Sequence, residues 1–172
     1  MPDLTNRRSA LAKATAAHEL IQQRPGLCIQ RLYAPANGFT EDLGLNLPQQ
    51  PNRATEGAGI GVLWLTPGEW LVVGDVPDLS AKAEAQGGAV SDLSHGRVVF
   101  RMPADLDREV LAKGSPLDLR GSVFLPGHCA QSLAANVAIL VHCPESGEHM
   151  DLYVARSYGR FIHDWLLDAA PK

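Results

Sequence analysis

The side chains best suited to bind a metal belong to two histidine-cysteine pairs and one further histidine. Within each pair the two residues are neighbours in the sequence. The pairs are His128-Cys129 and His142-Cys143, and His149 follows the second pair. Imidazole and thiolate are ligands that zinc prefers. Adjacent residues of a strand point to opposite faces, however, and no CxxC or HxH element supplies a local chelate. We therefore expect buried cysteines and ordinary polar histidines, and no metal site on this chain.

Nucleophilic catalysis needs a serine or cysteine beside a base, and Asp92, Ser94 and His95 place such side chains close together. The chain has no GxSxG elbow, and these residue types next to a glycine are also common turn formers. Asp118, between two leucines, is better suited to accept hydrogen bonds from backbone amides in a turn than to act as a base. The sequence therefore predicts no catalytic residue on this chain.

Two further patterns could bind a ligand. The first is the glycine-rich run from Gly57 to Gly61, but a dinucleotide loop requires a helix after its glycines, whereas a strand follows here. We expect no flavin, NAD or other cofactor on this chain. The second is a set of arginines that could hold a carboxylate or phosphate, for which solvated charge or contact with a partner surface is favoured: Arg97, Arg101, Arg120, Arg156 and Arg160.

The elements that position these residues are mainly short strands. Two apolar strands meet at Pro67-Gly68, with Trp64 before the turn and Trp70 after it. Both tryptophans are assigned to the core, and contact with a partner is the alternative. Further strands are predicted at 26–33, 89–93, 97–102, 128–135, 137–143 and 149–155, with 94–96 as a hairpin-like connection, and 49–56 is predicted to be a polar loop.

Helices are predicted from their caps and apolar spacing. Asn37, Asp105 and Ser157 are expected to cap helices over 37–45, 105–113 and 157–169, and a further helix is expected within 76–86. Residues 1–24 are expected to form an N-terminal arm with a weakly amphipathic helix that ends at Pro25-Gly26. The last helix carries an apolar stripe that must pack against a sheet, made of Tyr158, Phe161, Ile162, Trp165, Leu166 and Ala169.

Composition indicates a globular protein with one domain over residues 25–172. The chain has 172 residues, of which 45% are hydrophobic and 20% charged, and its net charge of −4 is spread along the sequence. Nothing resembles the basic footprint of a nucleic-acid-binding protein, and no apolar run reaches the length of a membrane span. Three cysteines without a CxxC pair favour reduced thiols and the cytoplasm. Strands joined by short turns and interrupted by a few helices predict an α+β fold with mainly antiparallel sheets.

Several segments together resemble the gamma subunit family of heterotetrameric sarcosine oxidase. The resemblance covers 57–170 well and 1–50 loosely, and its most specific element is 113–119, Lys-Gly-Ser-Pro-Leu-Asp-Leu. Ser115, Gly96 and Ser132 depart from the residues that are usual in the family. The other matching segments are 64–72, 90–98, 111–112, 124–132, 152–158 and 165–166.

The resemblance implies a fold similar to the folate-binding aminomethyltransferase (glycine cleavage T-protein) fold. It also implies an accessory, non-catalytic chain in a complex with alpha, beta and delta subunits. The complex would convert sarcosine, or a related N-methyl amino acid, to glycine, formaldehyde or methylenetetrahydrofolate, and hydrogen peroxide. FAD, FMN, NAD, tetrahydrofolate and zinc would belong to the other subunits. The alternatives are a free-standing small folate-binding or one-carbon-transfer domain and a generic interaction domain of an unrelated complex.

Overall fold

The computed structural model describes residue 11 and residues 19–171, which form two five-stranded sheets and three α-helices. Every strand pair is antiparallel. Sheet I runs in the order β1 (Gln22–Gln23), β7 (Arg97–Pro103), β10 (His149–Ala155), β9 (Val137–Cys143), β8 (His128–Ala134). Sheet II runs in the order β3 (Ala54–Gly57), β4 (Ile60–Thr66), β5 (Glu69–Val73), β2 (Ile29–Tyr33), β6 (Ala89–Asp92). The predicted α+β fold with mainly antiparallel sheets is confirmed.

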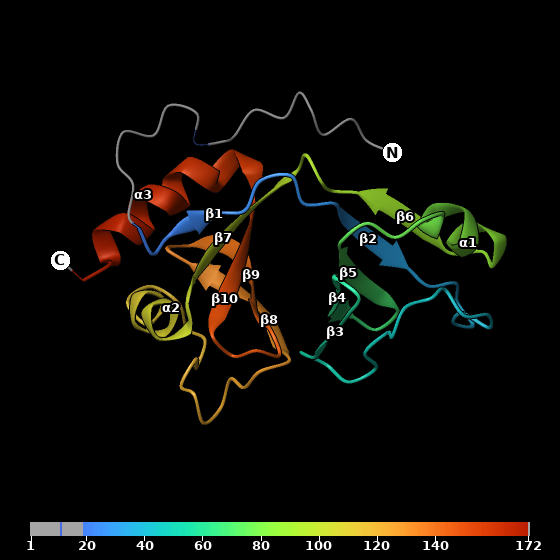
Figure 1. The fold of residues 1–172 in the computed structure, drawn as a ribbon, viewed down its shortest axis with the longest axis horizontal. Coiled ribbons are helices and arrows are strands. Elements are labelled where there is room, and N and C mark those ends of the chain that lie inside the picture. The colour runs from blue at the N-terminus through green and yellow to red at the C-terminus, as the bar shows by residue number, and fades with distance from the viewer. Residues whose placement is uncertain (1–10, 12–18, 172) are drawn as a thin grey trace.

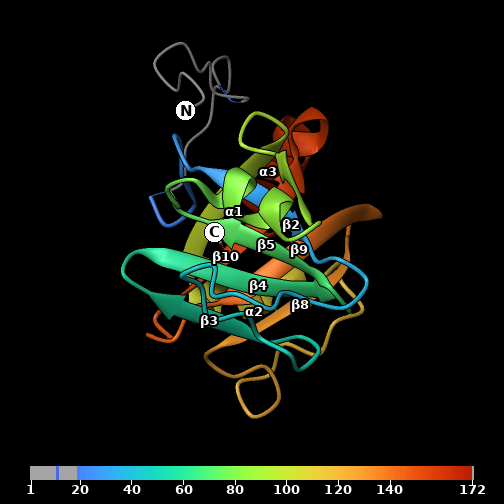
Figure 2. The same ribbon diagram turned by 90° about the vertical axis from the view of Figure 1, so that its right-hand side faces the viewer.

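The helices cover the outer faces of the two sheets. They are α1 (Leu79–Ala85), α2 (Ala104–Leu111) and α3 (Gly159–Ala169), and the 3-10 turn η1 (Arg156–Tyr158) precedes α3. Figure 1 shows α2 and α3 beside sheet I and α1 beside sheet II, and Figure 2 shows the strands of sheet II in front. Within the described part of the chain, no helix has the length and apolar character needed to cross a membrane.

Strand alternation builds these layers, as β7 illustrates. Val98 and Phe100 pack in the cluster that contains α2 and α3, whereas Val99 lies in the cluster between the two sheets. Arg97 and Arg101 lie two residues on either side of Val99 and therefore share its face. Because both faces of each sheet are covered, the strands bury apolar side chains in two directions.

The turn at Pro67-Gly68 has the predicted chemistry. Gly68 has φ +78°, which suits the third position of a type II turn after proline. Trp70 is 4% exposed and its indole N–H donates to the carbonyl of Pro48 at 2.8 Å. Trp64 is half-buried against the same cluster, which includes α1. The assignment to the core is therefore confirmed for Trp70, whereas Trp64 packs against the core and keeps part of its surface exposed.

The expected hairpin across residues 94–96 is wrong. Strand β6 pairs with β2 in sheet II, whereas β7 pairs with β1 and β10 in sheet I, so the chain crosses between sheets here. Ser94 anchors the crossing, because its Oγ accepts from the amide of Ile29 at 2.9 Å and lies 3.3 Å from the Ile29 carbonyl. Local sequence shows the turn residues but not the distant partners of the two strands.

Three segments differ from the expected helices and loop. Residues 37–45 form turns and bends without a helix, because Gly38 and Gly44 each have φ +75°, outside the right-handed helical region. The side-chain carbonyl of Gln86 accepts from the amides of Thr40 and Glu41 in this segment. Within the expected N-terminal helix, residues 22–23 form β1 instead and pair with β7. The rest of that helix prediction, apart from residues 11 and 19–24, lies outside the described residues. Part of the expected loop 49–56 belongs to β3, which pairs with β4.

The helix starts and the last apolar stripe also need correction. Helix α2 follows β7 directly with Pro103 at its N-cap, and Ser157 lies in η1 rather than at a cap. Ile162 and Leu166 are buried against sheet I as predicted. Tyr158 lies in η1, before α3 begins, and both Tyr158 and Phe161 are 52% exposed.

Asp107 in α2 is a buried carboxyl group that the sequence did not single out. It is 0% exposed, and neither of its oxygens has a hydrogen-bond partner among the described residues. Burial, and secondly the charge of Asp151, raise the pKa of Asp107 from 3.8 to about 7. In the folded protein Asp107 is therefore mainly protonated below about pH 7.

The Asp107→Asn substitution should remove a pH dependence of stability. Because the folded pKa lies above the unfolded one, the wild-type free energy of unfolding falls as the pH rises from about 4 to about 7. The slope is at most about 1.4 kcal/mol per pH unit, and it levels off above about pH 7. Asparagine cannot ionise, so the variant should gain stability relative to wild type between pH 5 and pH 8 in urea unfolding.

The exposed Asp105 on the same helix supplies the matched control. Asp105→Asn should keep the wild-type pH profile, because the Asp105 side chain is fully exposed to solvent. Parallel profiles for wild type and Asp107→Asn would contradict the assignment of a protonated Asp107.

Candidate functional site

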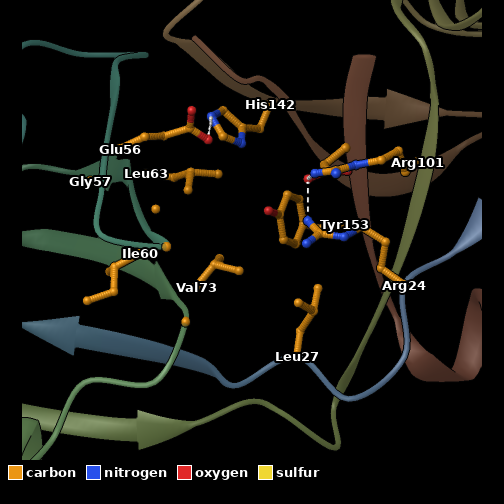
Figure 3. Close-up of a pocket in the computed structure, with 14 residues that line it drawn as sticks. Arg24, Leu27, Glu56, Gly57, Ile60, Leu63, Val73, Arg101, His142 and Tyr153 are labelled. Carbon is orange, nitrogen blue, oxygen red and sulfur yellow. Dashed lines mark hydrogen bonds and ion pairs between the residues drawn. The ribbon is translucent and has the colours of Figure 1, made fainter. Parts of the chain in front are cut away.

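A cavity of about 290 Å³ lies between the two sheets and is the candidate site. The β3–β4 hairpin and the end of β5 form one wall, and β7, β9 and β10 form the other. Figure 3 shows Glu56, His142, Tyr153 and Arg101 around this space, with Arg24 also lining it. We call this space the inter-sheet cavity.

A three-residue ion-pair network forms one side of the inter-sheet cavity. Asp151 is 2% exposed and accepts from Arg101 at two positions, with Nε–Oδ1 and Nη2–Oδ2 distances of 2.7 Å. Arg24 Nη1 donates to Oδ2 of the same carboxylate at 2.8 Å. The hydrogen bond to Asp151 raises the pKa of Arg101. One buried carboxylate therefore holds two guanidinium groups that come from separate parts of the chain.

His142 and Glu56 face each other on the other side of the cavity. The His142 side chain is 3% exposed, and neither ring nitrogen has a hydrogen-bond partner within the described chain. Its Nε2 lies 3.8 Å from Oε1 of Glu56, which is too far for a direct hydrogen bond. Burial lowers the pKa of His142, so the ring is neutral at pH 7 and can donate from one nitrogen and accept at the other.

Tyr153 stands in the middle of the layer between the sheets. It is 2% exposed, and Figure 3 shows its ring between the two arginines and the Leu63–Val73 side, with the hydroxyl directed toward sheet II. Burial, followed by the nearby charge of Asp151, raises the pKa of Tyr153. The phenol therefore stays protonated and can donate a hydrogen bond to a ligand.

The glycine-rich run 57–61 forms the turn of the β3–β4 hairpin and leads into a strand, as predicted. Gly74, with φ +125°, follows β5 directly and lies under this turn. A Cβ at Gly74 would lie 2.9 Å from the carbonyl oxygen of Gly59 and 3.1 Å from Cα of Ile60. Glycine at this position therefore allows the hairpin to close against the end of β5 and complete the cavity wall.

Neighbouring residues of the second histidine-cysteine pair point to opposite faces of sheet I, as strand geometry predicts: His142 lines the inter-sheet cavity, whereas Cys143 does not. The two cysteines also lie on different faces. Cys129 lies between the sheets, and Cys143 lies on the face toward α2 and α3. The Cys129 thiol donates to the carbonyl of Arg53 at 3.3 Å, and burial raises the pKa of Cys129 to about 12. Burial also raises the pKa of Cys143. Protonated thiols are weak nucleophiles and poor metal ligands.

The histidines do not converge either. His128 Nδ1 accepts from the amide of Leu125 at 3.3 Å, and its ring meets Phe124 edge-on. Burial lowers the pKa of both His128 and His149. Across residues 11 and 19–171, no group of three or more His, Cys, Asp or Glu side chains is placed to hold a metal.

The two candidate acid-base segments are turns. The carboxylate of Asp92 accepts from the amide of Ser94 at 2.8 Å. Asp118 likewise accepts from the amide of Arg120 at 3.1 Å, and the Arg120 guanidinium lowers the pKa of Asp118 to about 2. These contacts confirm that both aspartates satisfy turn amides.

The five candidate arginines separate into different environments. Arg101 belongs to the buried network, and Arg97 lies on the same strand face. Arg120 and Arg160 are exposed and pair with Asp118 and Asp164, which is compatible both with solvated charge and with contact with a partner surface. Arg156 lies in η1.

Sequence reasoning missed Arg24, Glu56, Asp151 and Tyr153 as cavity residues. A signal exists in β10, where His149, Asp151 and Tyr153 alternate with apolar residues. Such alternation normally indicates a solvent-facing side. Here that side faces sheet II, which only the packing of the two sheets reveals.

Together these groups can bind a small polar molecule. The cavity is lined by the carboxylates and guanidinium groups described above, by the neutral imidazole of His142 and by the phenol of Tyr153. Leucine, isoleucine, valine and glycine residues form the rest of its walls. The described residues around it include no serine or cysteine paired with a base. The arrangement suits recognition rather than covalent chemistry.

Solved structures share this architecture. A chain of the heterotetrameric sarcosine oxidase from Corynebacterium sp. U-96, in complex with pyrrole 2-carboxylate, matches with a TM-score of 0.77 and 24% identity, covering 95% of this chain and 94% of that chain. The aminomethyltransferase T of the glycine cleavage system from Bartonella henselae matches with a TM-score of 0.54 and 15% identity, covering 82% of this chain and 43% of that chain. This chain therefore has an α+β fold similar to that of the aminomethyltransferase T (T-protein).

The sequence narrows this class to one family. The sequence model of the sarcosine oxidase, gamma subunit family matches residues 32–172. Because the match spans most of the chain, the chain belongs to that family. The comparison with curated proteins found no match.

Replacing Asp151 tests the ion-pair network. Asp151→Asn leaves Arg24 and Arg101 without their shared carboxylate, and breaking a buried pair in this way costs about 3 kcal/mol. Urea unfolding at pH 7 should show this loss. The matched control is Asp118→Asn, which breaks a bidentate pair with Arg120 in full contact with water. Equal losses in the two variants would show that burial adds nothing to the Asp151 network.

Proposed function

We propose that this chain is the accessory gamma subunit of a heterotetrameric sarcosine oxidase-like complex. The observation that carries the proposal is the family match over residues 32–172. The fold shared with a chain of a heterotetrameric sarcosine oxidase supports it. The proposed partners are alpha, beta and delta subunits, and the proposed location is the cytoplasm.

In this proposal the chemistry belongs to the partners. They would oxidise sarcosine, or a related N-methyl amino acid, to glycine, formaldehyde or methylenetetrahydrofolate, and hydrogen peroxide. FAD, FMN, NAD, tetrahydrofolate and zinc would be held by those chains. The protonated thiols of Cys129 and Cys143 and the turn roles of Asp92 and Asp118 support a non-catalytic gamma chain.

Exposed apolar side chains support a role in assembly. Tyr158 ends η1 and Phe161 lies in the first turn of α3. Val123 and Leu125 lie in the loop before β8. Each is between 45% and 52% exposed. Aromatic and aliphatic side chains of this kind are covered when subunits associate.

Expression with and without partners tests this proposal. The full chain purified alone should be colourless and should produce no hydrogen peroxide from sarcosine. Co-expression with the alpha, beta and delta subunits of the same source should give a yellow complex that contains the chain and oxidises sarcosine. Stoichiometric flavin on the isolated chain would contradict the proposal. So would a fully assembled and active complex that lacks this chain.

The alternative function is a free-standing small folate-binding or one-carbon-transfer domain. The likeness to an aminomethyltransferase and the inter-sheet cavity favour it. At about 290 Å³ the cavity is at the lower end of the range for ligand pockets, so it would enclose only part of a tetrahydrofolate molecule. Calorimetric titration with tetrahydrofolate separates the two functions. Tight saturable binding by the isolated chain supports the alternative, and no binding supports the subunit.

A further inference from the structure

A second, smaller cavity of about 90 Å³ lies in the layer between the sheets, separate from the candidate site. Tyr153 lines both cavities, so its ring stands between them. Arg31 from sheet II and Arg97 from sheet I line the smaller cavity together with Gln131. Leucine and alanine side chains from both sheets supply the rest of its walls.

Arg31 is held in place by groups around it. Its Nε donates to Oε2 of Glu69 at 3.1 Å, and its Nη2 donates to the same oxygen. The guanidinium also lies 5.2 Å from the centre of the Tyr33 ring. The Glu69 carboxylate therefore balances the charge of Arg31.

Arg97 has no such balance. It is half-buried, and no carboxylate of the described residues lies within ion-pair distance of its guanidinium. Burial, and secondly the charge of Arg31, lower the pKa of Arg97. A guanidinium that is removed from water beside another cation is unfavourable until an anion pairs with it.

We propose that the smaller cavity is a carboxylate-binding site in which Arg97 supplies the guanidinium. One uncompensated positive charge matches one carboxylate, which a guanidinium binds through two parallel hydrogen bonds. A water molecule occupies about 30 Å³ in the liquid, so the cavity has room for a group of only a few non-hydrogen atoms. The apolar walls suit the carbon atoms behind the carboxylate.

Two sources can supply this carboxylate, and they share the same chemistry. One is a free small carboxylate, and the other is an aspartate or glutamate side chain of a partner subunit. Gln131 Nε2 donates to the carbonyl of Leu65 at 2.7 Å, so one of its two amide N–H groups is already engaged. Neither source requires flavin or folate on this chain.

Titration of the full chain with sodium acetate tests the site, with sodium chloride at matched ionic strength as the reference. The Nε–H signal of Arg97 in a nitrogen-15 NMR spectrum, assigned by its absence from Arg97→Gln, should shift saturably with acetate only. Amide signals around the cavity should follow the same curve in wild type and should respond about tenfold more weakly in Arg97→Gln. The matched control Arg160→Gln removes an exposed arginine and should bind acetate like wild type.

A second, more conservative variant at Arg97 keeps the test valid if Arg97→Gln does not fold. If circular dichroism shows that Arg97→Gln is unfolded, Arg97→Lys takes its place, since lysine keeps the charge but lacks the two parallel donors. Weaker binding in this variant supports the site. No saturable response of wild type to acetate, or an equal response of the Arg97 variant, overturns it.

The co-expressed complex separates the two sources. If a partner side chain fills the site, acetate no longer affects Arg97 in the complex, and Arg97→Gln reduces co-purification of the other subunits. If the ligand is a free carboxylate, acetate still binds in the complex and assembly is unchanged. The titration of the isolated chain does not depend on the proposed subunit role, so either conclusion can fail without the other.

Discussion

The packing of the two sheets through one shared apolar layer determines the other main features of this structure. Val99 and Tyr153 from sheet I meet Leu63 and Leu71 from sheet II in this layer. Burying a side chain of this size stabilises a fold by about 1.5–3 kcal/mol. The helices cover the outer faces, so the strands are buried on both sides. The inward-facing polar residues Asp151 and Tyr153 therefore line the cavities that remain between the two sheets.

Charge is handled differently at the two cavities. At the larger one, Asp151 holds Arg24 and Arg101, and the burial of these charges is offset by direct hydrogen bonds. At the smaller one, Glu69 balances Arg31 while Arg97 keeps its charge without an acidic neighbour among the described residues. The satisfied network at Asp151 stabilises the fold, whereas the charge of Arg97 is the basis of the carboxylate site that we propose.

Membership of the sarcosine oxidase, gamma subunit family and the chemistry of the buried groups lead to the same proposal. Cys129 and Cys143 are buried as thiols, and the aspartates at 92 and 118 satisfy turns. Fold alone does not imply function, since the same architecture occurs in an aminomethyltransferase. The inter-sheet cavity is suited to recognition of a polar group, which is compatible with a chain whose partners carry the reaction.

The sequence by itself determined the α+β class, most of the strands and the turn at Pro67-Gly68, because alternation and turn chemistry are local properties. It also identified Asp92 and Asp118 as turn residues. Only the tertiary structure decided that β6 and β7 belong to different sheets, that residues 37–45 form no helix, and that Tyr158 and Phe161 are exposed. The cavities also required it, because their contacts join distant residues. Ser94 bonds to Ile29 across 65 positions and Arg101 to Asp151 across 50, and no local pattern encodes such pairs.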